Sequence, residues 1–285
     1  MRRAAVFHYR HLMTGSAMSA WWLLFPLLGV VAGVLAGLLG VGGGLVLVAA
    51  LVYLLPLVGV PPEAAMHAAL ASSLASIILT AAASARAHAR RGSVLWPTVA
   101  WMVPGLLLGG WLGSGAAVQI GDDVLRWIVA GYCLLAAAQL QFGRPRQESA
   151  TGQAAPRGWP ILAAGGGIGA LSAVVGIGGG SMTVPLLVWR GVAPVRAVGT
   201  SSACGVAIGF ASAVGYAMHA PAGALPAHAI GYVYLPAAIG VAIASIFAAP
   251  LGTRLAHRLH GDALKRIFAV FLVVVAVSLL VTGAI

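Results

Sequence analysis

Long runs of apolar residues, separated by short polar segments, recur along the whole chain. A run of about 20 apolar residues can cross the roughly 30 Å hydrocarbon core of a bilayer as a helix. The runs do not alternate apolar with polar residues, as the strands of an outer-membrane barrel would. The pattern therefore predicts an all-α polytopic membrane protein. The predicted helical elements are Trp21–Leu39, Leu45–Val58, Pro61–Arg86, Val94–Leu112, Val124–Phe142, Trp159–Val175, Met182–Trp189, Ala197–Met218, Ala229–Ala249 and Ile267–Thr282.

Composition supports the membrane class and changes how the charge is interpreted. Hydrophobic residues make up 61% of the chain and charged residues 7%, with a mean hydropathy of +1.00. Soluble domains carry about 25% charged residues. The net charge of +11 would suggest nucleic acid in a soluble protein, but here the arginines sit between apolar runs and act as topology signals. The expected partner is the lipid bilayer and not nucleic acid.

Two glycine-rich segments interrupt apolar runs in corresponding places. They are Gly40-Val41-Gly42-Gly43-Gly44 and Gly176-Ile177-Gly178-Gly179-Gly180-Ser181. Each is followed by an apolar segment, Leu45–Val58 or Met182–Trp189, that is too short to span a bilayer at 1.5 Å per residue. Irregular backbone at membrane depth persists only where protein buries it or where it lines a cavity. The paired breaks therefore predict a binding site near the midplane.

A second match makes the chain an internal repeat. Ala71-Ser72-Ser73 in the first half corresponds to Thr200-Ser201-Ser202 in the second. Each half then holds about five helical elements in the same order, the second of them short or re-entrant. The predicted organisation is a basic N-terminal segment (1–17), a first membrane repeat (18–142), a polar linker (143–158) and a second membrane repeat (159–285).

The arginines indicate how the two repeats are related. The positive-inside rule places the basic segments Arg86–Arg91, Arg144–Arg157 and Arg254–Arg266 in the cytoplasm. These placements agree with one another only if the two repeats are inverted, which is the usual construction of a secondary transporter. Both termini would then lie outside, although the arginines of residues 1–17 are unusual there.

The chemistry of the breaks favours an anion. A helix N-terminus carries partial positive charge and free N–H donors, which suit an oxyanion. All five acidic residues lie near segment ends or in loops, so no central carboxylate is available for a cation. Close helix packing is the alternative explanation for the glycines and hydroxyls. The candidate substrate-binding residues are Gly42, Gly43, Gly44, Ser72, Ser73, Gly178, Gly179, Gly180, Ser181, Thr200, Ser201 and Ser202.

No catalytic, metal or cofactor site is expected. The apolar spans show no nucleophile–base pair and no His-x-x-x-His or Cys-x-x-Cys spacing, which argues against an enzyme. Cys133 and Cys204 lie far apart in apolar segments and are expected to be buried thiols. His67, His219 and His228 lie near helix ends on the expected outer side. Interfacial solvation explains them, and coupling to a proton is the alternative.

At these motifs the chain resembles the sulfite exporter TauE/SafE family of small-anion permeases. The resemblance lies in Gly37–Gly44, in Gly176–Pro185 and in Gly199–Ser202, and it extends from about Trp21 to Ile285. Two positions depart from the family pattern. Ala49 stands where a proline is common, and Ala71 stands where a threonine precedes the serines.

The resemblance implies a multi-pass inner-membrane permease for sulfite, organosulfonates or small carboxylates. Together with the repeat, it predicts a secondary transporter that works by alternating access. A passive anion channel on the same scaffold is the alternative, and a purely structural membrane protein would not need duplicated short helices. A coupling proton and a homodimer are both left open.

Overall fold

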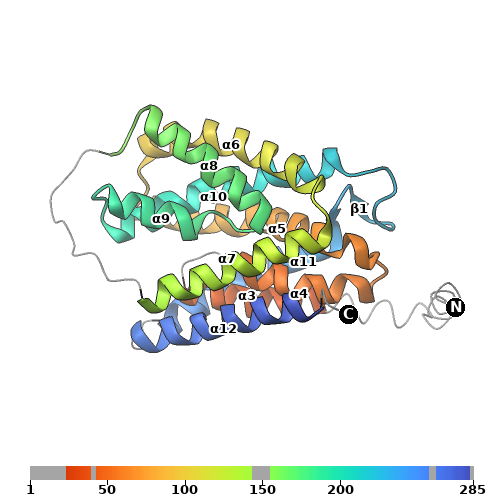
Figure 1. The fold of residues 1–285 in the computed structure, drawn as a ribbon. Coiled ribbons are helices and arrows are strands. Elements are labelled where there is room, and N and C mark those ends of the chain that lie inside the picture. The colour runs from red at the N-terminus through yellow and green to blue at the C-terminus, as the bar shows by residue number, and fades with distance from the viewer. Residues whose placement is uncertain (1–23, 40–42, 143–154, 257–260, 283–285) are drawn as a thin grey trace, which may run out of the picture.

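A computed structural model of the chain describes residues 24–39, 43–142, 155–256 and 261–282. Within these residues the helices lie side by side along an elongated bundle (Figure 1). Pro62–Arg90, Trp96–Val118 and Pro194–His219 are long and apolar enough to cross a membrane, and shorter apolar helices fill the rest. The elements are α3 (Leu24–Leu39), α4 (Gly44–Leu57), η1 (Pro62–Ala64), α5 (Ala65–Arg90), α6 (Trp96–Val118), α7 (Asp122–Phe142), α8 (Trp159–Val175), α9 (Gly180–Trp189), α10 (Pro194–His219), β1 (Ala229–Ile230), β2 (Val233–Tyr234), α11 (Leu235–Ala256) and α12 (Gly261–Thr282).

The prediction of helical elements is confirmed with two corrections. The element predicted at Ala229–Ala249 begins instead with a hairpin of β1 and β2, and its helix starts at Leu235. Gly231 has a φ of 56° in the tight turn of this hairpin, a value that glycine adopts without strain. The basic segment Arg254–Arg266 is largely helical, because α11 continues to Ala256 and α12 begins at Gly261.

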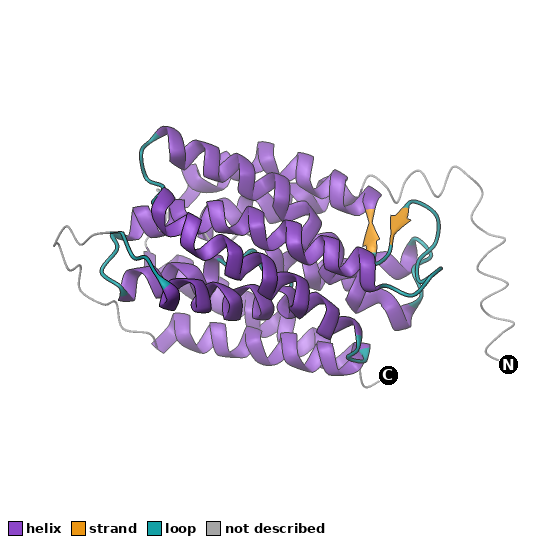
Figure 2. Ribbon diagram, turned by 90° about the horizontal axis from the view of Figure 1, so that it is seen from above, coloured by secondary structure: helices purple, strands orange, loops and turns teal. Residues whose placement is uncertain are grey.

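The two ends of the bundle are named here after residues of α5. The His67 end is where α5 begins, and the Arg91 end lies just beyond its last residue. The β1–β2 hairpin lies at the His67 end, where the N–H of Tyr234 donates to Ser72 Oγ at 3.0 Å. Figure 2 shows both strands at this one end of the bundle.

Helices of the first half of the chain pair with helices of the second half. The first helix of the first half, α3, packs along α11 of the second half. Gly29 lies against Val241 and Gly33 against Ser245, so the two helices run parallel. A Cβ on Gly29 would lie 2.6 Å from the Val241 carbonyl oxygen, and one on Gly33 would lie 2.7 Å from Ser245 Cα. Only glycine permits this approach, which is typical of helix pairs in membranes.

The corresponding pair, α6 and α8, packs in the same way, side by side along one edge of Figure 1. The glycines of α6 that touch the backbone of α8 are spaced four residues apart. The residues of α8 that they touch are also spaced four residues apart, in the same order along the chain. The contacts are Gly105 with Leu162, Gly109 with Gly166, and Gly113 with Ala170. This pair is therefore also parallel, and its glycines allow the two backbones to come into close contact.

The third elements of the two halves, α5 and α10, also pack together, but in opposite directions. Their contacts, read along α10, descend along α5: Gly199 with His88, Gly205 with Ala81, and Gly209 with Leu74. The fifth elements, α7 and α12, form the last such pair.

Replacing Gly109 with alanine should destabilise the fold. A Cβ there would collide with the Gly166 carbonyl oxygen, a backbone atom that cannot turn away. Overpacking of this kind costs about 1–3 kcal/mol. Thermal unfolding of the purified protein should show a midpoint several degrees lower. Gly167→Ala on α8 is the control, because nothing lies within 4 Å of its Cβ position. An unchanged midpoint for Gly109→Ala would contradict this packing.

Candidate functional site

Both predicted glycine breaks interrupt helices. In the second half α8 ends at Val175, Gly176 follows with a φ of 78°, and Gly179 has a φ of 74° immediately before α9. In the first half Gly43 has a φ of 63° immediately before α4. Left-handed backbone of this kind strains any residue with a Cβ, which explains why glycine stands at these positions. Gly42 falls outside the described residues.

The two breaks belong to helical hairpins that enter the bundle from opposite ends. Since α11 begins directly after the β1–β2 hairpin, its parallel partner α3 also begins at the His67 end, and α4 returns there to join η1. In the same way α8 begins beside the start of α6 at the Arg91 end, and α9 returns there to join α10. The helices of 14 and 10 residues after the breaks are therefore re-entrant.

The two hairpins meet where the breaks lie. A Cβ on Gly44 would lie 2.6 Å from the Gly176 carbonyl oxygen and 3.3 Å from Ile177 Cα. Ser73 Oγ lies 3.2 Å from the carbonyl oxygen of Gly44 and 3.3 Å from that of Gly176, and its side chain is fully buried. The Ser73 hydroxyl therefore donates to the junction of the two breaks and stabilises it.

A cavity of about 480 Å³ extends from this junction along α5 toward the Arg91 end. Five of the predicted binding residues line it: Gly43, Gly178, Gly180, Ser201 and Ser202. Polar side chains that the sequence analysis did not select also line it: Thr80, Ser84, His88, Arg91 and Ser245. Thr80, Ser84 and His88 lie on α5 at a spacing of four residues, which places them on one face of the helix, and Arg91 directly follows the helix.

The charged and polar groups that line the cavity favour an anion over a cation. Among the described residues that line it, none is an aspartate or glutamate, whereas Arg91 and His88 lie at one end. At the other end are the N-termini of α4 and α9, and neither helix has a side-chain cap. Their first N–H groups and partial positive charge suit an anion.

Two serines of α10 add hydroxyl groups to the cavity. Ser201 is 4% exposed, and its hydroxyl has no hydrogen-bond partner among the described residues. Ser202 Oγ lies 3.0 Å from Ser84 Oγ and also donates to the Val198 carbonyl. Ser201 is therefore the hydroxyl most available to a ligand.

The remaining predicted residues have partners within the protein. Ser72 accepts from the Tyr234 N–H, and Thr200 accepts from the Leu95 N–H at 3.0 Å and donates to the Arg196 carbonyl at 2.7 Å. Ser181 Oγ shares a 2.6 Å hydrogen bond with the Tyr132 hydroxyl. Gly44 and Gly179 pack against Gly176 and Ile208. These positions shape the site, and none of them lines the cavity.

Comparison with known proteins identifies the family. Residues 25–279 match the family described as sulfite exporter TauE/SafE. The chain belongs to the TauE/SafE family. This TauE/SafE protein is 35% identical over 265 residues to a probable membrane transporter protein of Haemophilus influenzae, which covers 92% of this chain and 99% of the relative.

More distant relatives carry the same description. Probable membrane transporter proteins of Xylella fastidiosa and Methanocaldococcus jannaschii are 29% and 24% identical to it, over 87% and 85% of this chain and 91% and 90% of the relatives. No solved structure matches the chain significantly. This TauE/SafE protein is therefore a multi-pass membrane protein of a transporter family.

Proposed function

We propose that this protein is a secondary transporter of small sulfur-containing or carboxylate anions across the inner membrane. The observation that carries the proposal is the cavity at the junction of two uncapped helix N-termini, lined by hydroxyls, His88 and Arg91 and by no described carboxylate. An anion there is neutralised by backbone N–H groups and by Arg91, so it needs no further countercharge.

The cavity also indicates the size and shape of the substrate. Its volume of about 480 Å³ lies within the usual range for small-molecule sites and exceeds what a bare inorganic anion fills. Its walls include Leu47, Ile77 and Ile246, which suit an apolar group beside the anionic head. An organosulfonate fits this description, as does sulfite with its hydration water. The family description agrees with both.

We further propose that the two halves, residues 18–142 and 159–285, are inverted repeats. Their third elements, α5 and α10, run antiparallel, and the pairs α3–α11 and α6–α8 exchange helices in matching fashion. The two re-entrant hairpins enter from opposite ends. This is the arrangement expected of a pseudo-two-fold axis in the membrane plane.

Alternating access accounts for the cavity better than a passive channel does. The cavity reaches from the Arg91 end to the glycine junction, beyond which Leu70 and Val48 pack against Gly176. A channel would need a continuous path past this junction. With the arginines of α5 placed in the cytoplasm, the conformation is open to the inside.

Reconstitution into proteoliposomes tests the proposal. Radiolabelled sulfite and a panel of sulfonates and carboxylates are offered with and without an opposing concentration gradient. We expect accumulation of at least one of these anions against its gradient. The Ser201→Ala variant should raise the KM about tenfold, because a hydrogen bond to a charged group contributes about 1.5–3 kcal/mol.

Ser212→Ala is the matched control for this experiment. It removes a buried hydroxyl from the same helix, α10, but Ser212 does not line the cavity. Its KM should stay within twofold of wild type. Equilibration without accumulation would favour the channel, and a wild-type KM for Ser201→Ala would remove the proposed site.

A further inference from the structure

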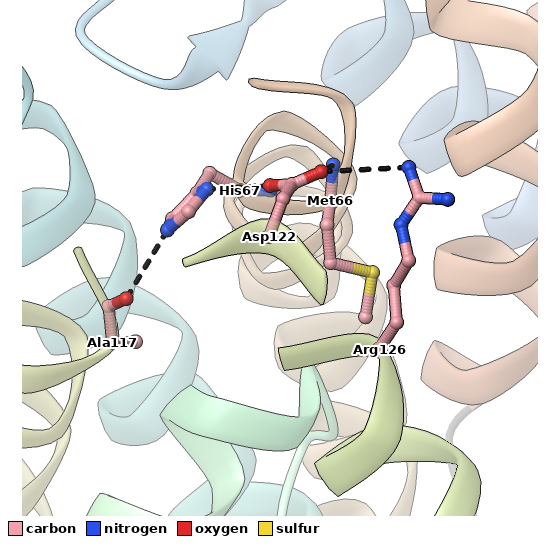
Figure 3. A network of polar contacts seen from close by, with 5 residues as sticks. All are labelled: Met66, His67, Ala117, Asp122 and Arg126. Atoms are coloured by element: carbon pink, nitrogen blue, oxygen red, sulfur yellow. Dashed lines mark hydrogen bonds and ion pairs between the residues drawn. The ribbon is translucent and has the colours of Figure 1, made fainter. Parts of the chain in front are cut away.

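A second polar cluster closes the His67 end of the bundle (Figure 3). Helix α5 begins there without a side-chain cap of its own. Asp122, the first residue of α7, supplies one from outside. Its Oδ2 accepts the N–H of Met66 at 3.0 Å, and its Oδ1 accepts the N–H of His67 at 3.3 Å. Arg126 lies 3.6 Å from Oδ2. Both carboxylate oxygens of Asp122 therefore act as hydrogen-bond acceptors.

The same carboxylate fixes the protons of the His67 ring. Nε2 lies 3.1 Å from the carbonyl oxygen of Ala117, which can only accept, so Nε2 carries a hydrogen. Nδ1 lies 2.7 Å from Asp122 Oδ1, and an ionised carboxylate also only accepts. Both ring nitrogens therefore face acceptors, an arrangement that fits an imidazolium, and the residue is 5% exposed. The expectation that His67 is a solvated interfacial side chain is wrong.

The His67 ring also contacts the β1–β2 hairpin of the second half. Tyr232, in the turn of this hairpin, stacks on His67 with ring centroids 4.9 Å apart and an interplanar angle of 22°. A cation over an aromatic face is attracted to it, more so where water is excluded. The Ser72–Tyr234 hydrogen bond fastens the next strand to α5 one turn further on. The hairpin thus covers the end of the bundle opposite the open cavity.

We propose that His67 and Asp122 form a proton-binding site that locks the His67 end of the transporter closed. The inference rests on the proposed alternating access. If the His67 ring loses a proton, it keeps only one N–H donor for its two acceptors, Asp122 Oδ1 and the Ala117 carbonyl. It also loses the positive charge that faces the Tyr232 ring. Protonation therefore favours the closed form, and a higher pH favours opening.

The other titratable groups near the His67 ring come from the hairpin, α7, α10 and η1. Burial, and then the nearby Asp122 carboxylate, raise the pKa of the Tyr232 hydroxyl, and burial raises the pKa of Tyr234, so both stay neutral. On α7, Arg126 forms its ion pair with Asp122 at 3.6 Å. On α10, Tyr216 donates its hydroxyl hydrogen to the Ala173 carbonyl. The other acids near this end, Glu63 and Asp123, are exposed.

Cysteine accessibility in purified, lipid-nanodisc-embedded protein tests the lock without any substrate. Leu70→Cys, in a Cys133→Ala/Cys204→Ala background, places a thiol at a fully buried position beside Gly176. Its labelling by a water-soluble thiosulfonate reagent is normalised at each pH to the exposed site Ala222→Cys. We expect the normalised rate to rise at least fivefold between pH 5.5 and pH 8, because loss of the ring proton removes one of the two hydrogen bonds and the positive charge beneath Tyr232.

Three variants separate the lock from general loosening. Adding His67→Gln should give a high rate at both pH values, and His67→Lys, which keeps a positive charge, should give a low rate at both. Adding His219→Gln should keep the parental pH dependence, because His219 bonds to its own helix at Gly215 and faces Trp111.

Two results would overturn the inference. One is a parental rate that does not change with pH, and the other is a pH dependence that survives His67→Gln. If His67→Gln does not stay monodisperse, Tyr232→Leu replaces it, and it should raise the rate at pH 5.5. Because labelling needs no substrate, failure here is distinct from failure of the transport assay, which would instead remove the proposed function.

Discussion

A methyl group at Gly44 should reduce anion transport at least tenfold. Its Cβ would lie 2.6 Å from the Gly176 carbonyl oxygen, at the point where the two re-entrant hairpins meet. Alanine is the better helix former by about 1 kcal/mol, which would favour the substitution in isolation. The steric cost of overpacking is about 1–3 kcal/mol and acts directly on the geometry of both breaks, so we expect it to dominate.

The initial rate of uptake into proteoliposomes measures this effect, with the best substrate of the anion panel and equal amounts of monodisperse protein. Gly131→Ala on α7 is the matched control, since nothing lies within 4 Å of its Cβ position. It should transport at the wild-type rate. A Gly44→Ala protein that also transports normally would show that close contact of the two breaks is not required.

Reversing the charge of Arg91 should reduce anion entry from the cavity side at least tenfold. Arg91 lines the cavity at its open end, and His88 lies one turn before it on α5. Arg91→Glu would place a carboxylate where the described lining has none. An anion would then meet repulsion instead of attraction along its path, and the effect should weaken as salt screens it over about 10 Å at 0.1 M.

Arg90→Glu makes the same change in net charge one residue earlier, at an exposed position outside the cavity lining. Uptake by the two variants is compared at low and at high ionic strength. Arg90→Glu should lose less than twofold. Equal losses in both variants would mean that overall charge, and not the cavity path, controls the rate.

The sequence predicted the helical elements because its strongest signals are local. Apolar runs, the triplets around Gly43 and Gly179, and the match of Ser72-Ser73 with Ser201-Ser202 are readable without knowing any contact. They predicted the short helices after each break, which the structure contains.

The roles of individual hydroxyls could not be predicted in this way. Whether a buried hydroxyl is free depends on backbone groups that are distant in sequence. The Leu95 N–H, for example, donates to the Thr200 hydroxyl, and the Ser73 hydroxyl donates to two backbone carbonyls. The hairpin at Ala229–Tyr234 was missed because its residues are as apolar as a span. The cavity face of α5 was readable in principle, since Thr80, Ser84 and His88 recur every four residues.

The exchange of α3 and α6 with α11 and α8 has a consequence for biogenesis. The ribosome makes α3 long before α11, so the glycine face of α3 at Gly29 and Gly33 enters the lipid without its partner. A nascent chain that ends at the linker leaves α6 equally unpaired. We therefore expect that neither half matures alone, and that the bundle stays open to quality-control proteases until synthesis of the chain is nearly finished.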